Sequence, residues 1–192
     1  RSTPLYSSAA SDVYKRQQLA LCLMFQYGGM SFVDFAHLNS GNIKNGILDY
    51  NRQKTGTSMR LEVLDTAEAM YKELAGERAG GSGYLFPFLS GTKNGHEEYL
   101  EYNAALSRFN RNLKTLREVA GIASDVTSYT IRHSFAMALK EQNVPIEMIS
   151  ELLGHKSIKT TQIYLRSFSL DKMTVVNKSC FENVYNYMPE VG

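Results

Sequence analysis

The chain has 192 residues, of which 43% are hydrophobic, so it can bury the core of one globular domain and does not have the composition of a disordered protein. No apolar run approaches the roughly 18 residues that a membrane-spanning helix needs, and no secretory signal pattern is present, so we expect a cytoplasmic protein without a membrane partner. The formal net charge of +2 does not by itself indicate a nucleic-acid partner. Cys22 and Cys180 show neither CxxC nor Cys/His spacing, so the sequence predicts no disulfide framework and no zinc site.

The first residues differ in pattern from the rest of the chain. Residues 1–17 lack hydrophobic periodicity, which begins abruptly with QLALCLMFQY. Residues 7–17, SSAASDVYKRQ, match the in-frame translation of an adapter used in transposase-based sequencing libraries. We therefore interpret residues 1–17 as a translated sequencing-adapter artefact, and we expect them to add nothing to the core and to replace natural upstream sequence. Without their three basic residues and one acidic residue, the formal net charge falls from +2 to zero.

The remaining sequence predicts a mainly helical α+β fold with a small antiparallel sheet. Between the second and third helices, GILDYNRQKTGTSMRLEVL alternates and turns as a β-hairpin with Lys54 at its tip. Residues 78–98 are rich in Gly and Ser and are interpreted as a surface connection. Hydrophobic periodicity predicts helices over residues 18–27, 31–38, 65–78, 97–120, 127–142, 145–153, 158–168 and 171–187.

A basic stripe runs along the predicted helix 97–120. Arg108, Arg111, Lys114 and Arg117 recur at every third position, beside an apolar face that includes Phe109. Such a stripe can hold a phosphate backbone, or it can be the solvated face of an ordinary amphipathic helix.

Two later segments place chemically useful side chains at helix boundaries. Gly154 follows the last apolar position of helix 145–153 and suits its C-terminal stop, so His155 lies just beyond the helix end. Ser157 suits the N-cap of the next helix, which carries Tyr164 about two turns along. Upstream, Arg132 lies among core-facing positions of helix 127–142 and therefore needs an anionic partner, either a bound anion or a buried carboxylate.

The stretch TSYTIRHSFAMALKEQNVPIEMISELLGHKSIKTTQIYLRS resembles the second catalytic box of tyrosine recombinases, the phage-integrase family. In that box an Arg-His pair precedes LLGH, a TT dipeptide and the nucleophilic tyrosine. The resemblance implies a catalytic domain over residues 18–178, preceded in the family by a DNA-clamping domain. It makes Tyr164 the nucleophile, Arg132 the second catalytic arginine, His155 the occupant of the His/Trp position and Lys54 the mobile catalytic lysine.

The sequence departs from the family pattern at two positions. Tyr129 stands where the family's HxxR motif has histidine, and a phenol can still donate a hydrogen bond there. In the first box, YGGMSFVDFAHL puts Ser31 in the slot of the first catalytic arginine, and the alternative slot holds Gly28. Integrases of Bacteroides-type mobile elements look similar here, with G-M-x-F-x-D and Y-x-R-x-K-T-G patterns. Neither slot supplies a guanidinium, so the resemblance implies either reduced activity or a site that another group completes.

The resemblance further implies a site-specific recombinase or integrase that cuts and rejoins DNA through a 3′-phosphotyrosyl intermediate, with no metal and no cofactor. The implied partner is a double-stranded DNA attachment site, bound by a homotetramer that exchanges the tail 179–192 between subunits, in the bacterial nucleoid. The expected DNA-binding residues are Arg108, Arg111, Lys114, His133, Lys156 and Lys159. Three alternatives remain: a catalytically degenerate recombinase, a non-catalytic helical DNA-binding protein, and an enzyme like the type IB topoisomerases.

Overall fold

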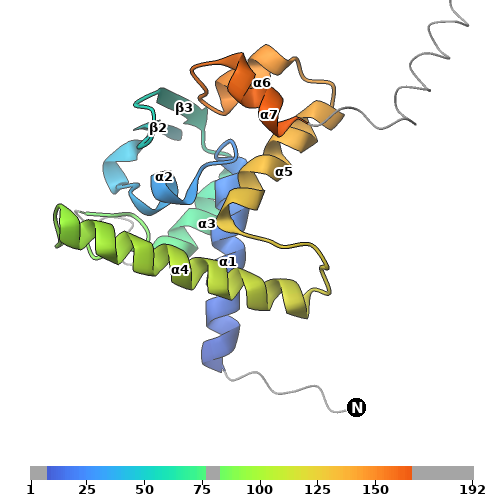
Figure 1. Ribbon diagram of the computed structural model, residues 1–192. Helices are drawn as coiled ribbons and strands as arrows, with labels where there is room; N and C mark the ends of the chain where they lie inside the picture. The colour runs from blue at the N-terminus through green and yellow to red at the C-terminus, as the bar shows by residue number, and fades with distance from the viewer. Residues whose placement is uncertain (1–7, 77–82, 166–192) are drawn as a thin grey trace, which may run out of the picture.

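The structure is a computed structural model that describes residues 8–76 and 83–165. Its three strands form an antiparallel sheet in the order β1-β2-β3 (Figure 1). The expected α+β fold, mainly helical with a small antiparallel sheet, is therefore confirmed. The elements are α1 (Ser8–Gln26), α2 (Phe32–Ala36), η1 (Ser40–Asn42), β1 (Ile43–Lys44), β2 (Ile47–Asn51), β3 (Ser58–Glu62), α3 (Asp65–Ala75), α4 (His96–Val119), α5 (Ser128–Glu141), α6 (Ile146–Leu152) and α7 (Ile158–Tyr164).

The predicted hairpin is present, and it carries Lys54 in its turn. β2 pairs with β3 from Ile47 opposite Glu62 to Asn51 opposite Ser58, and residues 53–55 form the turn between them. The short strand β1, which the sequence patterns do not predict, extends the sheet on the other side of β2. The predicted helix 171–187 lies outside the described residues, as does the end of the predicted helix 158–168.

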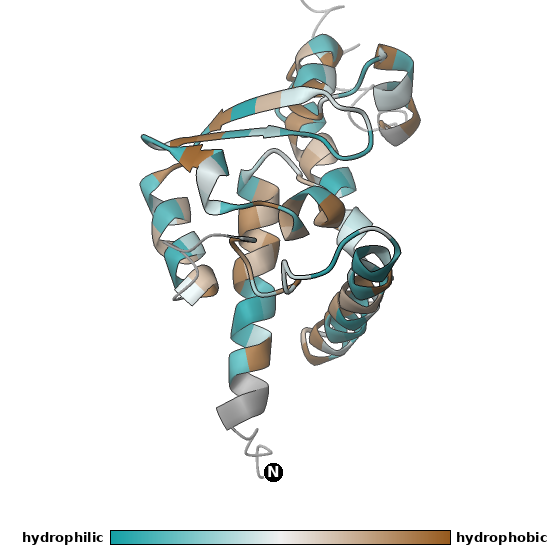
Figure 2. Ribbon diagram, turned by 90° about the vertical axis from the view of Figure 1, so that its left-hand side faces the viewer, coloured by the Kyte–Doolittle hydropathy of each residue, from teal (hydrophilic) through white to brown (hydrophobic). Residues whose placement is uncertain are grey.

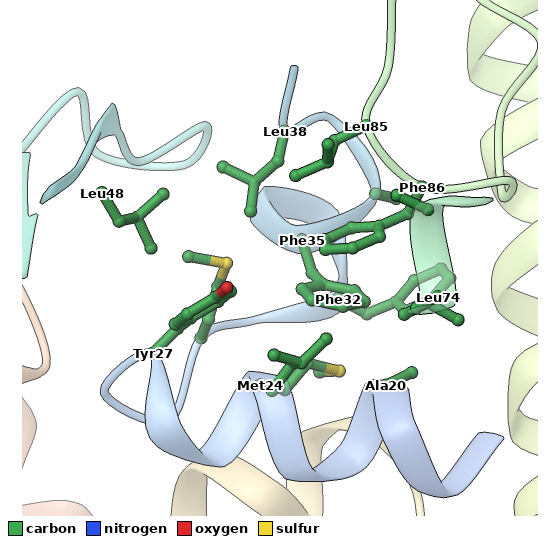
Figure 3. Packing of buried hydrophobic residues seen from close by; sticks show 14 of the residues in the cluster. Ala20, Met24, Tyr27, Phe32, Phe35, Leu38, Leu48, Leu74, Leu85 and Phe86 are labelled. Atoms are coloured by element: carbon green, nitrogen blue, oxygen red, sulfur yellow. The ribbon is translucent and has the colours of Figure 1, made fainter. Parts of the chain in front are cut away.

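The main core surrounds α1, which contacts α3 and α4 and lies between them in Figure 2. Leu23, Met24 and Tyr27 on α1 are at most 1% exposed, because they recur on the face that the other elements cover. Figure 3 shows Met24 and Tyr27 of α1 on the side that faces Phe32 and Phe35 of α2. Phe35 stacks on Phe86 with ring centroids 4.3 Å apart.

The predicted surface connection is wrong for residues 84–89. Leu85, Phe86 and Leu89 belong to the core and are at most 2% exposed. The Leu85 N–H donates a hydrogen bond to the carbonyl of Leu38, with N and O 2.6 Å apart, so the backbone of this segment is fixed beside α2. The buried apolar side chains of this segment add to the hydrophobic core that the helices form.

The start of α1 also differs from the prediction, since the helix begins at Ser8 and not at residue 18. Gln17 is only 4% exposed, and its side-chain amide donates to the carbonyl of Phe109 on α4, at 3.3 Å. Gln17 therefore lies in the interior, contrary to the expectation for residues 1–17. The hydrophobic core of the described part of the chain nevertheless begins only at Ala20.

A second, smaller cluster joins α5 to α6 and α7. Its buried members are Ala136, Ile149 and Leu153. α5 also packs on α1, and Gly29, just past the end of α1, lies against it, because an added Cβ there would be 2.9 Å from Cβ of Phe135. Gly29 thus allows the small cluster to lie directly against the main core.

Gly154 ends α6 in a conformation that suits glycine and leaves no room for a side chain. Its φ is +61°, and the N–H groups of Gly154 and His155 donate to carbonyls in the last turn of the helix, as in a Schellman motif. A Cβ at this position would lie 2.5 Å from Sδ of Met59 and 2.8 Å from Cδ of Arg52. The helix end is therefore in direct contact with the hairpin.

We predict that Gly154→Ala destabilises the protein more than Gly121→Ala does. Gly121 occupies the equivalent position after α4 and has a φ of +66°, but a Cβ added there would have nothing within 4 Å, so this variant isolates the backbone cost. That cost is about 1 kcal/mol, and overpacking should add roughly 1–3 kcal/mol at Gly154. Chemical denaturation of both variants measures the difference, and equal destabilisation would show that the hairpin contact is not tight.

Candidate active site

A cavity of about 360 Å³ opens where the turn of the hairpin, α5 and the α6–α7 connection meet. These elements gather at one end of the molecule in Figure 1. The lining carries two arginines, two lysines and one histidine, and no carboxylate. The lining residues are Ser31, Val33, Arg52, Lys54, Thr55, Tyr129, Arg132, His155, Lys156, Ser157 and Thr160.

Arg132 reaches the cavity from α5 through the interior and is only 3% exposed. Its Nη1 donates to the carbonyl of Gly29 at 3.1 Å, and its Nη2 donates to the carbonyl of Leu153. Burial, followed by the nearby charge of Arg52, lowers the pKa of Arg132 to about 10. The guanidinium therefore remains charged at neutral pH, and backbone carbonyls hold it in place.

His155 lies just after the α6 terminus, as predicted, and borders the same cavity. Its Nδ1 is 2.8 Å from Oγ1 of Thr161, a side chain of α7 that is fully buried. Burial, together with the charges of Arg132 and Arg52, lowers the pKa of His155 to about 4. The imidazole is therefore neutral at pH 7.

The sequence analysis did not single out two charged residues: Arg52, which lines the cavity, and Asp34, which pairs with it. Asp34 is on α2 and Arg52 follows β2, and they are 3% and 7% exposed. Nε of Arg52 is 3.5 Å from Oδ2 of Asp34, while its Nη1 donates to the carbonyls of Leu153 and Gly154 at 3.0 and 3.1 Å. The signal was available in Tyr50-x-Arg52-x-Lys54, because an arginine two residues before the expected lysine is close enough in the chain to reach the same cavity, which both residues line.

The two slots for a first arginine differ in their surroundings. Ser31 borders the cavity, and its hydroxyl donates to Oδ2 of Asp34 at 2.5 Å. Gly28 is buried, and a side chain there would meet the carbonyl of Leu152 at 3.2 Å. Tyr129 also borders the cavity and is 56% exposed. The cavity thus includes Ser31 and Tyr129 but not Gly28.

The predicted DNA-binding residues separate into two places. Lys156 borders the cavity, whereas Lys159 and His133 do not line it. Arg108, Arg111 and Lys114 are exposed along α4. Arg108 lines a different cavity of about 260 Å³ between α1 and α4. The first three members of the stripe are therefore solvent-facing, whereas Arg117 is largely buried and forms an ion pair with Asp125.

Tyr164 is the last residue of α7, the helix that follows His155 and Ser157. The position of its side chain lies outside the described part of the structure. Within that part, no helix is long and apolar enough to cross a membrane.

Known proteins share both the sequence pattern and the fold. Residues 5–170 match the Phage integrase family. A tyrosine recombinase of Thermosipho africanus is 28% identical over 163 residues, which make up 85% of this chain and 54% of that protein. Tyrosine recombinase XerD of Lacticaseibacillus casei is 42% identical over 69 residues, or 36% of this chain and 24% of that protein. The chain thus spans at most about half the length of these two relatives.

Solved structures show the same fold at low sequence identity. XerA recombinase superposes with a TM-score of 0.61 at 21% identity, covering 92% of this chain and 66% of that one. XerH bound to a palindromic difH substrate in a post-cleavage complex gives 0.62 at 18% identity, covering 90% and 47%. With a family match that spans most of its length and this fold, the chain belongs to the phage integrase family of tyrosine recombinases.

Proposed function

We propose that the chain is the catalytic part of a site-specific DNA recombinase or integrase that cleaves and rejoins strands through a 3′-phosphotyrosyl intermediate. The observation that carries the proposal is the convergence of Arg132, His155 and Lys54 on one cavity, although they come from α5, the α6–α7 connection and the hairpin turn. Family membership supports the reaction class, and the basic lining suits a polyanionic substrate.

In the proposed reaction, the phenol oxygen of Tyr164 attacks the scissile phosphorus and loses its proton to solvent. The bond from phosphorus to the 5′ oxygen breaks, and Lys54 supplies the proton that this oxygen takes as it leaves. Charge on the non-bridging oxygens is offset by Arg132, whose planar guanidinium suits a phosphate. A 5′ hydroxyl of another strand then reverses the steps, so the energy of the broken linkage is retained.

His155 is assigned a role as a neutral hydrogen-bond donor. If Nδ1 accepts a hydrogen bond from the Thr161 hydroxyl, the neutral ring carries its proton on Nε2, and this proton can reach a phosphate oxygen. The lowered pKa favours this neutral form across the physiological range. Tyr129, at the mouth of the cavity, is proposed to add a further hydrogen bond to the phosphate or to a neighbouring side chain.

The partners follow from the same proposal. The substrate is a double-stranded DNA attachment site, contacted by Lys156 at the cavity and by Lys159, His133 and the α4 stripe around it. Assembly is proposed as a homotetramer on DNA in which the tail 179–192, outside the described residues, passes to a neighbouring subunit. We further propose that the protein acts in the bacterial nucleoid and that it is related to integrases of Bacteroides-type mobile elements.

We predict that Tyr164→Phe abolishes covalent adduct formation with DNA, because phenylalanine has no oxygen to attack phosphorus. The probe is a pool of nicked duplex oligonucleotides with randomised sequence, from which adducts recovered on a denaturing gel supply a defined substrate. Tyr99→Phe, which alters an exposed tyrosine of α4, is the matched control and should retain the adduct. Adduct that persists in Tyr164→Phe would place the nucleophile elsewhere, and a chain that binds the duplex without any adduct would support the degenerate recombinase.

We also predict that stability falls as the pH drops from 6.5 to 4, in part through His155. In this window the unfolded chain takes up a proton at an ordinary histidine pKa, whereas folded His155 stays neutral until its pKa of about 4, so acid favours unfolding. His155→Gln should reduce the slope of the unfolding free energy by up to about 1 kcal/mol per pH unit. Denaturation at several pH values measures it, with His96→Gln, at the exposed start of α4, as the control. Equal slopes in all three proteins would contradict the lowered pKa.

A further inference from the structure

Arg52 is placed as a second phosphate-binding group would need to be. It is nine-tenths buried, yet it borders the cavity beside Arg132 and His155. It comes from the hairpin, not from the first box, where Ser31 and Gly28 leave the guanidinium missing. At the wall of an open cavity, the protein can bind some N–H donors of a buried guanidinium, and the remaining donors can bind a ligand.

Its hydrogen bonds leave donor capacity unused. Nη1 makes both bonds to backbone carbonyls, at Leu153 and Gly154. Nε is buried and has no hydrogen-bond partner among the described residues, because the nearest carboxylate oxygen, on Asp34, is 3.5 Å away. Nη2 takes part in none of these contacts. An oxyanion in the cavity would satisfy donors that the protein alone does not.

The guanidinium groups of Arg52 and Arg132 also lie close to each other. Nη1 of Arg52 and Nη2 of Arg132 donate to the same carbonyl oxygen, that of Leu153. Two cations are thus held side by side in a poorly solvated place, and Asp34 is the one buried carboxylate among the described residues. The two positive charges repel each other, and an anion in contact with both groups would offset this repulsion. The arrangement therefore favours binding of a phosphoryl group that is dianionic or that gains negative charge during the reaction.

Asp34 fixes the orientation of Arg52 and is therefore a positioning residue. Its Oδ1 accepts from the backbone N–H of Gln53 at 2.7 Å, and its Oδ2 accepts from the Ser31 hydroxyl at 2.5 Å. Both bonds orient the carboxylate toward the arginine that follows β2. The serine in the first-arginine slot thus acts through Asp34 on Arg52.

We propose that Arg52 replaces the missing first arginine, and that its guanidinium binds a non-bridging oxygen of the scissile phosphate together with Arg132. This assignment rests on the proposed function. Arg52 is then a catalytic residue that compensates for the serine at position 31. The altered first box therefore need not slow the reaction.

The test measures adduct formation by Arg52→Lys on the nicked duplex recovered from the randomised pool. Lysine retains the charge but cannot form the forked contact, so the rate should fall by about 100-fold or more. Arg60→Lys, on the exposed face of β3, is the matched control and should keep the wild-type rate. The paired variant Asp34→Asn with Arg52→Gln leaves no unpaired buried carboxylate, so it provides a folded comparison if Arg52→Lys is unstable.

A second substrate separates charge stabilisation from a purely structural role. A methylphosphonate at the scissile linkage replaces one charged oxygen by a methyl group, so it removes the charge that Arg52 is proposed to offset. On this substrate, the ratio of the wild-type rate to the rate of each Arg52 variant should be smaller by about tenfold or more. The reason is that the loss of one such hydrogen-bond donor typically lowers the rate by at least about that factor. A deficit of the same size on both substrates, with lowered thermal stability, would make Arg52 structural and overturn the assignment.

The outcomes also distinguish this assignment from the proposed function. Wild-type adduct together with an Arg52→Lys rate like that of the control overturns the assignment alone. A wild-type chain that binds the randomised duplexes without forming adduct overturns the proposed function, and the assignment with it.

Discussion

The carbonyl oxygen of Leu153 is the point on which the arrangement of the site depends. It accepts hydrogen bonds from both Arg52 and Arg132, and thereby ties the hairpin and α5 to the end of α6. Because this carbonyl is at the C-terminus of a helix, it has no partner within the helix and carries part of the negative end of the helix dipole. A helix end that would otherwise be unsatisfied in the interior thus becomes the acceptor for two buried cations. His155 is the second residue after it, so the same contact determines where the imidazole lies.

Burial of so much charge is unfavourable unless each group has several partners, and the partners here come from different segments. Arg132 is held by carbonyls of Gly29 and Leu153, and Arg52 by two carbonyls and the carboxylate of Asp34. Removal of one member of a buried ion pair typically costs about 3–5 kcal/mol, because the other charge stays behind without compensation. A chain that needed only stability would gain as much from apolar side chains at these positions. Two guanidiniums beside an open cavity are therefore consistent with the proposed binding of an anionic phosphate group.

Local patterns are sufficient to predict part of the site, and non-local burial explains what they miss. Gly154, His155 and Ser157 follow helix-boundary rules within a few residues, so their placement between α6 and α7 can be predicted, and alternation predicts Lys54 in the hairpin turn. The pair of Asp34 and Arg52 depends on the packing of α2 against the hairpin, which no periodicity reports. Residues 85–89 have Gly- and Ser-rich neighbours that suggest a surface loop, whereas their apolar side chains fill the gap beside Phe35. The role of Tyr164 is inferred from family resemblance and remains a proposal.

The cavity lies at the junction between a large core and a small one, and this location has a mechanical consequence. The main cluster extends from α1 to Ile131 on α5, whereas the cluster between α5 and the end of α6 has three buried residues, Ala136, Ile149 and Leu153. Burial of this small apolar area stabilises the packing of α6 and α7 by only a few kcal/mol. The hydrogen bonds from Arg52 and Arg132 therefore contribute a large share of the free energy that holds these two helices in place. Any anion that draws the guanidiniums toward the cavity competes with the carbonyls of Leu153 and Gly154 for the same donors. Ligand binding and the attachment of α6 and α7 are therefore coupled through one set of hydrogen bonds, and the helix that carries Tyr164 is the element whose position depends on that balance.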